Sequence, residues 1–83
     1  MTPEYDAAMR VTHSVRHDMA YIAFQEIGLG EAKYQHPVRD DRLAAEIILD
    51  IAADGRLLGL EVLGATQGLS PVILKNAERI DTD

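Results

Sequence analysis

The segment 46–63 constrains the fold more than any other part of the chain. Two runs rich in Ile, Leu and Val flank Asp54-Gly55, a dipeptide typical of the type I′ hairpin turn, whose central residues both need positive φ. A two-residue turn, or a four-residue loop of the same parity, places six aliphatic side chains on one face: Ile47, Leu49, Ile51, Leu58, Leu60 and Val62. A three-residue loop is disfavoured, because the shifted register would bring Glu61 onto that face.

The opposite face of this hairpin is mixed in character. It holds three carboxylates and three large apolar side chains: Glu46, Asp50, Glu61, Ile48, Leu57 and Leu63. A solvated antiparallel sheet commonly has such a face, but its apolar side chains are candidates for a second buried contact. Gly59 interrupts the second strand, and we expect a bulge there or a large side chain lying across it.

The residues before this hairpin predict further strands. Alternating side chains indicate one strand at 9–13 and another at 19–25, and the short polar turn 14–18 between them favours a hairpin. A weaker alternation at 32–35 predicts a short strand that Pro37 ends or places at a sheet edge.

The period changes after residue 63 and predicts one C-terminal helix over 70–80. Ser70 is a good N-cap, Pro71 suits the first helical position, and Leu69 and Leu74 occupy the hydrophobic-staple positions. Because so short a helix is unstable alone, it is expected to dock on the sheet.

Together these elements predict a single α+β domain over residues 1–83. A curled antiparallel sheet of four to five strands, spanning residues 7–65 as a meander of hairpins, carries the helix on its aliphatic face. Residues 1–6 are expected to form a loose N-terminal arm.

The composition excludes several classes of function. Fourteen Asp and Glu against eight Lys and Arg give a net charge of −6, which disfavours nucleic-acid and anionic-membrane partners. The absence of cysteine rules out disulfides and thiolate metal sites. The longest apolar run, 19–24, is far too short for a membrane span, and no leader opens the chain. We therefore expect a cytoplasmic protein.

The titratable residues offer two weak candidate sites. His13 and His17 flank one predicted turn near Asp18, but His36 lies elsewhere and no metal-ligand spacing occurs, so solvated turn histidines are the preferred interpretation. Asp50, Glu61 and Tyr21 could divide acid and base roles only in a water-poor pocket. Neither a phosphate loop nor a nucleophile elbow is present, and we predict no catalytic residues, cofactor or metal.

One part of the chain resembles a known family. Residues 48–66 carry an L-D-x-x-x-D-G-R-L-x-G-L-E-V-L pattern that ends in Ala65-Thr66, and Asp18-Met19-Ala20-Tyr21-Ile22 precedes it. Both are similar to motifs of the small bacterial domain-of-unknown-function family DUF2283, although of the usual acidic positions in the first turn only Asp18 is kept. The family has no established activity. Its occasional linkage to small toxin-like genes implies an antitoxin or accessory partner.

Three functional hypotheses follow, in order of preference. The first is a non-enzymatic protein-interaction domain that forms a homodimer. Its interface would be the mixed face or the edge strand, with the candidate residues Tyr21, Ile48, Leu57, Leu63 and Tyr34. The second is an antitoxin-like acidic partner of a small basic toxin, whose negative charge speeds the encounter. The third is a small acid/base enzyme that uses the carboxylates of the sheet face.

Overall fold

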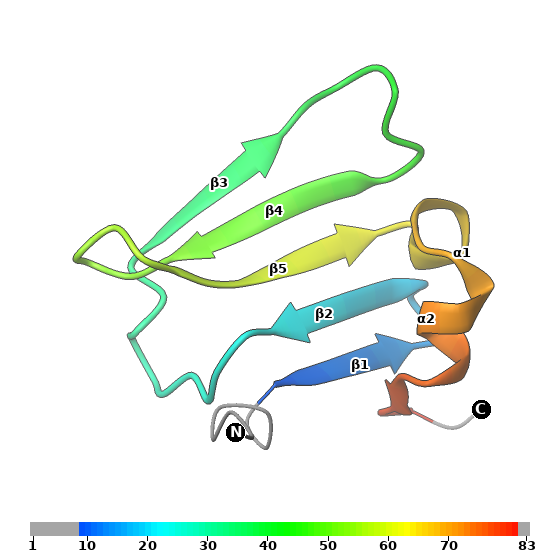
Figure 1. The fold of residues 1–83 in the computed structure, drawn as a ribbon, viewed down its shortest axis with the longest axis horizontal. Helices are drawn as coiled ribbons and strands as arrows, with labels where there is room; N and C mark the ends of the chain where they lie inside the picture. Colours follow the sequence, from blue (N-terminus) through cyan, green and yellow to red (C-terminus); the bar gives the residue numbers. More distant parts are fainter. Residues whose placement is uncertain (1–8, 82–83) are drawn as a thin grey trace, which may run out of the picture.

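The computed structural model describes residues 9–81, which form an open, mixed six-stranded sheet with two short helices at one end (Figure 1). The elements are β1 (Arg10–Ser14), β2 (Met19–Ala23), β3 (Tyr34–Val38), β4 (Glu46–Ile51), β5 (Leu57–Leu63), α1 (Ala65–Gly68), α2 (Pro71–Lys75) and β6 (Glu78–Arg79). The α+β class is confirmed, whereas the predicted number of strands and the single helix are wrong. Residues 1–6, predicted as a loose arm, lie outside the described residues.

The strand order corrects the predicted meander. The order is β3-β4-β5-β2-β1-β6, so β2 lies beside β5 and not beside β3. The predicted hairpin of β1 and β2 is confirmed by their antiparallel pairing. At the far edge β3 contains Pro37 within it, and an edge suits proline because it has no N–H to donate to a second neighbour.

The main hairpin has most of the predicted register, but its loop is longer than the predicted two-residue turn and one strand contains a bulge. Leu49 lies opposite Leu60 as expected. The two-residue turn, however, is wrong, because the Ala52 N–H donates to the Arg56 carbonyl at 2.8 Å and encloses the three residues 53–55. A register shift between Asp50 and Ile51 compensates, so that Ile51 pairs with Leu57 instead of Leu58. This bulge returns the aliphatic side chains to one face despite the odd loop length.

The C-terminal segment differs from the helix predicted over 70–80. The Ser70 cap is confirmed, since its hydroxyl accepts from the Ile73 N–H at 3.5 Å, but α2 ends at Lys75. The chain then extends, and β6 pairs in parallel with β1. Extended backbone carries Asp81 to the β1–β2 turn, where its carboxylate accepts from Ser14 Oγ at 2.6 Å and the Val15 N–H at 2.9 Å.

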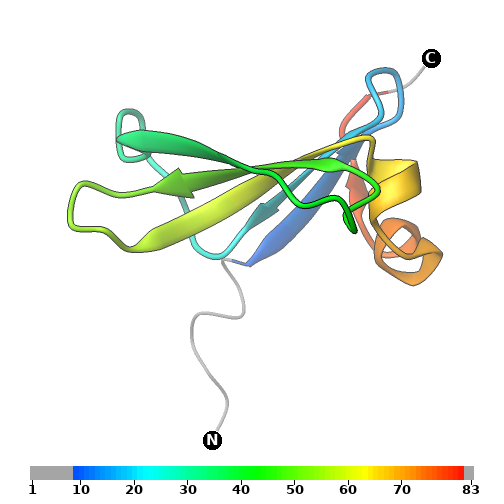
Figure 2. The same cartoon turned by 90° about the horizontal axis from the view of Figure 1, so that it is seen from above.

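The two helices lie at one end of the sheet (Figure 2), and a cluster of buried residues, Ala20, Val62 and Ala65, includes the first residue of α1. Among the described residues, the buried apolar side chains are Ala20, Leu58, Val62 and Ala65. The two predicted staple residues, Leu69 and Leu74, pack against the cluster of Ala20, Val62 and Ala65. In the part of the chain that the structure describes, no helix has the length and apolar character needed to cross a membrane.

Candidate functional site

The face of the sheet that carries the helices is built from three rows of side chains. Residues directly opposite one another on neighbouring strands project to the same face, so the register defines each row. The covered row lies under the helices and consists of Val38, Ile47, Val62, Ala20 and His13. The open rows lie farther from the helices. One is His36, Leu49, Leu60, Ile22 and Val11, and the other is Tyr34, Ile51, Leu58 and Phe24. Leu58 is assigned by its alternation with Leu60, because the bulge pairs Ile51 with Leu57. We call the three rows together the apolar face.

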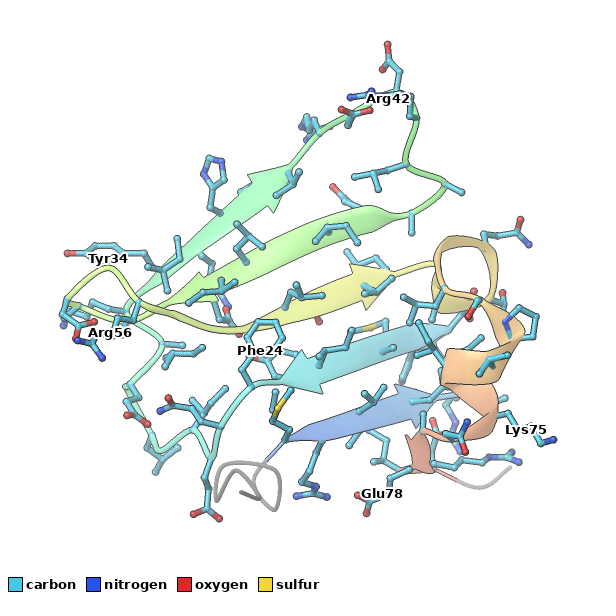
Figure 3. All side chains as sticks on the ribbon, in the orientation of Figure 1. Phe24, Tyr34, Arg42, Arg56, Lys75 and Glu78 are labelled. Atoms are coloured by element: carbon cyan, nitrogen blue, oxygen red, sulfur yellow. The ribbon has the colours of Figure 1, made fainter. Side chains whose placement is uncertain are left out.

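No Asp, Glu, Lys or Arg occurs in these three rows. In these rows, Ile47 of the covered row and Leu60 of the open rows pack against the core cluster of Ala20, Val62 and Ala65. Most side chains of the open rows are half-buried, although Leu58 is buried. Tyr34 is 57% exposed. Figure 3 shows Phe24 and Tyr34 away from the end where the helices lie. The apolar face therefore has a surface that this chain does not cover by itself.

The opposite face, which we call the carboxylate face, centres on Asp50. The Tyr21 hydroxyl donates to Asp50 Oδ2 at 2.6 Å, and the Gln35 amide donates to Asp50 Oδ1 at 3.2 Å. Asp50 is only 8% exposed, which corrects the expectation that it is a solvated surface carboxylate. A carboxylate shielded from water is tolerated here because both oxygens accept hydrogen bonds.

Gly59 leaves the space that the Tyr21 side chain needs to cross β5 and reach Asp50. A Cβ at residue 59 would lie 2.6 Å from the Tyr21 hydroxyl and 2.6 Å from the Ile22 carbonyl oxygen. The expectation that a large side chain lies across this glycine is confirmed. The tyrosine crosses β5 over Gly59, from β2 to Asp50 on β4, and links three strands.

The ionisation of Tyr21 is strongly suppressed. Its burial, followed by the hydrogen bond to the Asp50 carboxylate, raises the pKa of the phenol well above its usual range. Glu61 lies directly opposite Tyr21 on β5, so the three residues of the enzymatic hypothesis do lie together. The shallow hollows found in the described chain do not include them. The larger, about 530 Å³, lies beside the 39–45 connection.

The other predicted interface residues lie in different surroundings. Ile48 and Leu63 are half-buried on the carboxylate face. Leu57 is 43% exposed at the bulge, and Tyr34 belongs to the apolar face at the sheet edge. The helix was expected to cover the aliphatic face of the main hairpin, but Leu49 on that face is only half-buried. The small number of helical residues relative to the strands was the available signal.

Asp18 has a structural role that the sequence did not reveal. Its backbone is left-handed, with φ of 51°, and its carbonyl accepts from the N–H groups of Gly64 and Ala65, each at 2.9 Å. The carboxylate accepts from the Thr66 N–H at 3.0 Å and the Thr66 hydroxyl at 2.8 Å. These bonds hold the pKa of Asp18 below its usual range. Asp18 thus joins the β1–β2 turn to the start of α1.

The three histidines do not lie together at one site. His17 and His36 are exposed, but the expectation of a solvated histidine is wrong for His13, whose side chain is 12% exposed in β1. Its Nε2 is buried without a hydrogen-bond partner, 3.7 Å from Asp18 Oδ1. Within residues 9–81, no group of three His, Cys, Asp or Glu is placed to hold a metal ion.

Comparison with known families decides the relationship suggested by the motifs. The model of a family described as a protein of unknown function, DUF2283, matches residues 11–65, about two thirds of the chain. The chain belongs to the DUF2283 family. The match runs from β1 to the first residue of α1, so both faces of the main sheet lie within it, while α2 and β6 lie beyond it. Neither curated proteins nor solved structures show a significant similarity to the chain.

Within the DUF2283 match, the motif residues have structural tasks. Asp18 and Thr66 bind each other across the sheet end. Asp50 receives Tyr21, and Gly59 gives that tyrosine room. These motif residues therefore take part in the hydrogen bonding and packing of the sheet.

Proposed function

We propose that the chain is a non-enzymatic protein-interaction domain that forms a homodimer. The observation that carries this proposal is the incomplete cover of the sheet. Helices of four and five residues lie against one end of a six-stranded sheet, and two of the four buried apolar residues in the described chain are alanines.

A small domain with so few buried side chains gains stability when a second copy covers its remaining apolar surface. Each Å² of apolar surface removed from water contributes about 25 cal/mol, while domains of this size retain a small margin of stability. A homodimer supplies the cover with no second gene product, because a two-fold interface uses the same surface twice.

The arrangement of the carboxylate face supports a non-enzymatic function. The Tyr21 hydroxyl and both Asp50 oxygens are engaged in hydrogen bonds within the chain. A tyrosine phenol is protonated at neutral pH in any case, and the raised pKa of Tyr21 makes its ionised form still less accessible. A substrate would have to break these contacts on an open face, where water competes for each polar group.

Sedimentation equilibrium of the purified chain tests the proposal. Over a loading series from low to high micromolar concentration, we expect the mean mass to rise from the monomer value of 9.1 kDa toward twice that value. A mass that stays monomeric at the highest concentration would refute the homodimer.

A second candidate function is binding to a small basic protein. It is favoured by Glu46 and Glu61, which lie on the carboxylate face of a chain with net charge −6, since such a face attracts cationic partners. Titration with the purified product of a neighbouring small basic gene would test it. The affinity should fall with added salt and on Glu46→Gln and Glu61→Gln substitution, and an affinity unchanged by these substitutions would reject this candidate.

A further inference from the structure

We infer that two copies of the chain meet through the open rows of the apolar face, sheet against sheet. This inference rests on the proposed homodimer and specifies its interface. It differs from the mixed-face interface predicted from the sequence, because Glu46, Asp50 and Glu61 lie on one face, whereas the open rows of the other hold no Asp, Glu, Lys or Arg.

The distribution of charge favours a second copy as the occupant of this surface. Each chain carries a net charge of −6, so two copies repel unless they meet where neither presents a carboxylate. The open rows hold no Asp or Glu, and an uncharged apolar surface is complementary to itself across a two-fold axis. A basic partner would instead gain its Coulomb attraction on the opposite face.

The carboxylate face is a poor surface for self-association. A two-fold contact there brings Glu46 and Glu61 of one copy close to the same residues of the other. Like charges facing each other across an interface cost several kcal/mol. Burying Glu61 would also remove it from water, and no basic side chain lies opposite it among its cross-strand neighbours Tyr21 and Ile48.

The exposed edge is also less suitable. An edge-to-edge dimer needs a row of free N–H and C=O groups on β3. Pro37 is the fourth of the five residues of this strand, and a proline has no N–H to donate. Continuous pairing of two β3 strands would therefore lose a donor in each copy.

The open rows are large enough for a small interface. With strands about 4.8 Å apart and rows about 6.6 Å apart, one row of five residues and one row of four cover roughly 300 Å² in projection. Accessible area exceeds projected area because the side chains stand out from the sheet. A specific interface buries about 500 Å² or more per copy, so the dimer would use most of these rows.

Two matched pairs of lysine substitutions test the inference by sedimentation. Leu49 and Ile48 are adjacent, half-buried residues of β4 that point to opposite faces, and Tyr34 and Gln35 are the corresponding exposed pair on β3. Lysine lowers the net negative charge, so weaker association cannot come from greater overall repulsion. Circular dichroism confirms that each variant is folded, and the β3 pair gives a readout if a β4 variant is not.

We expect Leu49→Lys and Tyr34→Lys to raise the dimer dissociation constant at least tenfold, while Ile48→Lys and Gln35→Lys change it less than threefold. The reverse pattern, or equal weakening by both members of each pair, would overturn the assignment of the interface while the homodimer itself stands. If the wild-type chain is monomeric, the proposed homodimer, on which this inference rests, is itself refuted.

Discussion

The two faces of the central sheet are shielded from water in different ways. On the carboxylate face, the one deeply buried acid, Asp50, is enclosed by Tyr21 and Gln35, which come from β2 and β3. On the apolar face, Ile47 and Leu60 pack against the core cluster, while Tyr34 and His36 of the open rows are exposed. The buried acid is thus enclosed by side chains of the same chain, whereas the uncharged open rows are covered only in part.

This difference shows where stability and function are expected to reside. Hydrogen bonds to Asp50 fix the order of the central strands at every protein concentration, since all partners belong to one chain. The open rows contribute fully only when a second copy covers them, so their contribution depends on concentration. Changes to the two faces should therefore have different signatures in unfolding and in association experiments.

The largest expected effect on unfolding comes from Leu58, the buried side chain within the open rows. Leu58→Ala should lower the free energy of unfolding by about 2–5 kcal/mol, because Leu58 is 3% exposed and its removal leaves a cavity. Its neighbour Leu57 is 43% exposed, and Leu57→Ala serves as the control with a loss below about 1 kcal/mol. Urea denaturation at one fixed protein concentration measures both free energies of unfolding. Equal losses would show that Leu57 and Leu58 do not differ in burial at the bulge.

A smaller effect is expected where Tyr21 crosses β5. Gly59→Ala should cost about 1–3 kcal/mol, because the added Cβ meets the Ile22 carbonyl and the Tyr21 hydroxyl at 2.6 Å. Gly28→Ala adds a Cβ whose nearest neighbour, Glu31 Oε1, is 3.7 Å away, and should change the free energy far less. A neutral Gly59→Ala would mean that the tyrosine does not lie across the strand.

The hydrogen bond itself can be tested with Tyr21→Phe. This substitution leaves one oxygen of buried Asp50 without its donor and should cost about 1–2 kcal/mol in urea denaturation. Tyr34→Phe is the control, because Tyr34 is 57% exposed and is expected to have little effect on unfolding.

The same tyrosine predicts a dependence on alkaline pH. Because the folded-state pKa of Tyr21 is raised, its contribution to stability is present below the unfolded-state value of about 10 and is lost as pH rises toward the folded-state value. Absorbance titration should show one tyrosine ionising late in the wild type and missing from Tyr21→Phe. Ionisation of every tyrosine near pH 10 in the folded chain would contradict the buried contact.

The smallest effect is expected at the turn that anchors α1. The pKa of Asp18 is lowered by its bonds to Thr66, so its contribution to stability is present above the unfolded-state pKa and lost as pH falls through the folded-state value. The difference in Tm between wild type and Asp18→Ala should shrink between neutral pH and pH 3. Asp41→Ala, at an exposed loop residue, is the control, and a difference independent of pH would exclude the carboxylate cap.

The local patterns predicted β1, β2, β4 and β5, because alternation with period two follows directly from strand geometry. They placed β3 at 32–35 instead of Tyr34–Val38 and assigned the segment of β6 to a helix. They did not predict the compensation between the three-residue loop and the bulge near Leu58, since each feature alone reverses the pattern and together they restore it. The position of β2 beside β5 also escaped prediction, because strand order depends on long-range packing that no local motif encodes.

The site was predicted only in part, for a related reason. The sequence placed Asp50 on the face opposite the aliphatic row, but its burial depends on Tyr21, which lies 29 residues earlier in the chain. The open rows were misjudged because Ser70 and Pro71 identify where a helix begins, while its end at Lys75 is fixed by contacts of the following segment with β1.

Chemical cross-linking tests the division between the two faces most directly, since the chain contains no cysteine. Single variants Leu49→Cys and Ile48→Cys place one thiol on the apolar face or on the carboxylate face. With a short bis-maleimide at high micromolar protein, we predict rapid formation of covalent dimers from Leu49→Cys and little from Ile48→Cys. Preferential linking of Ile48→Cys would contradict the account.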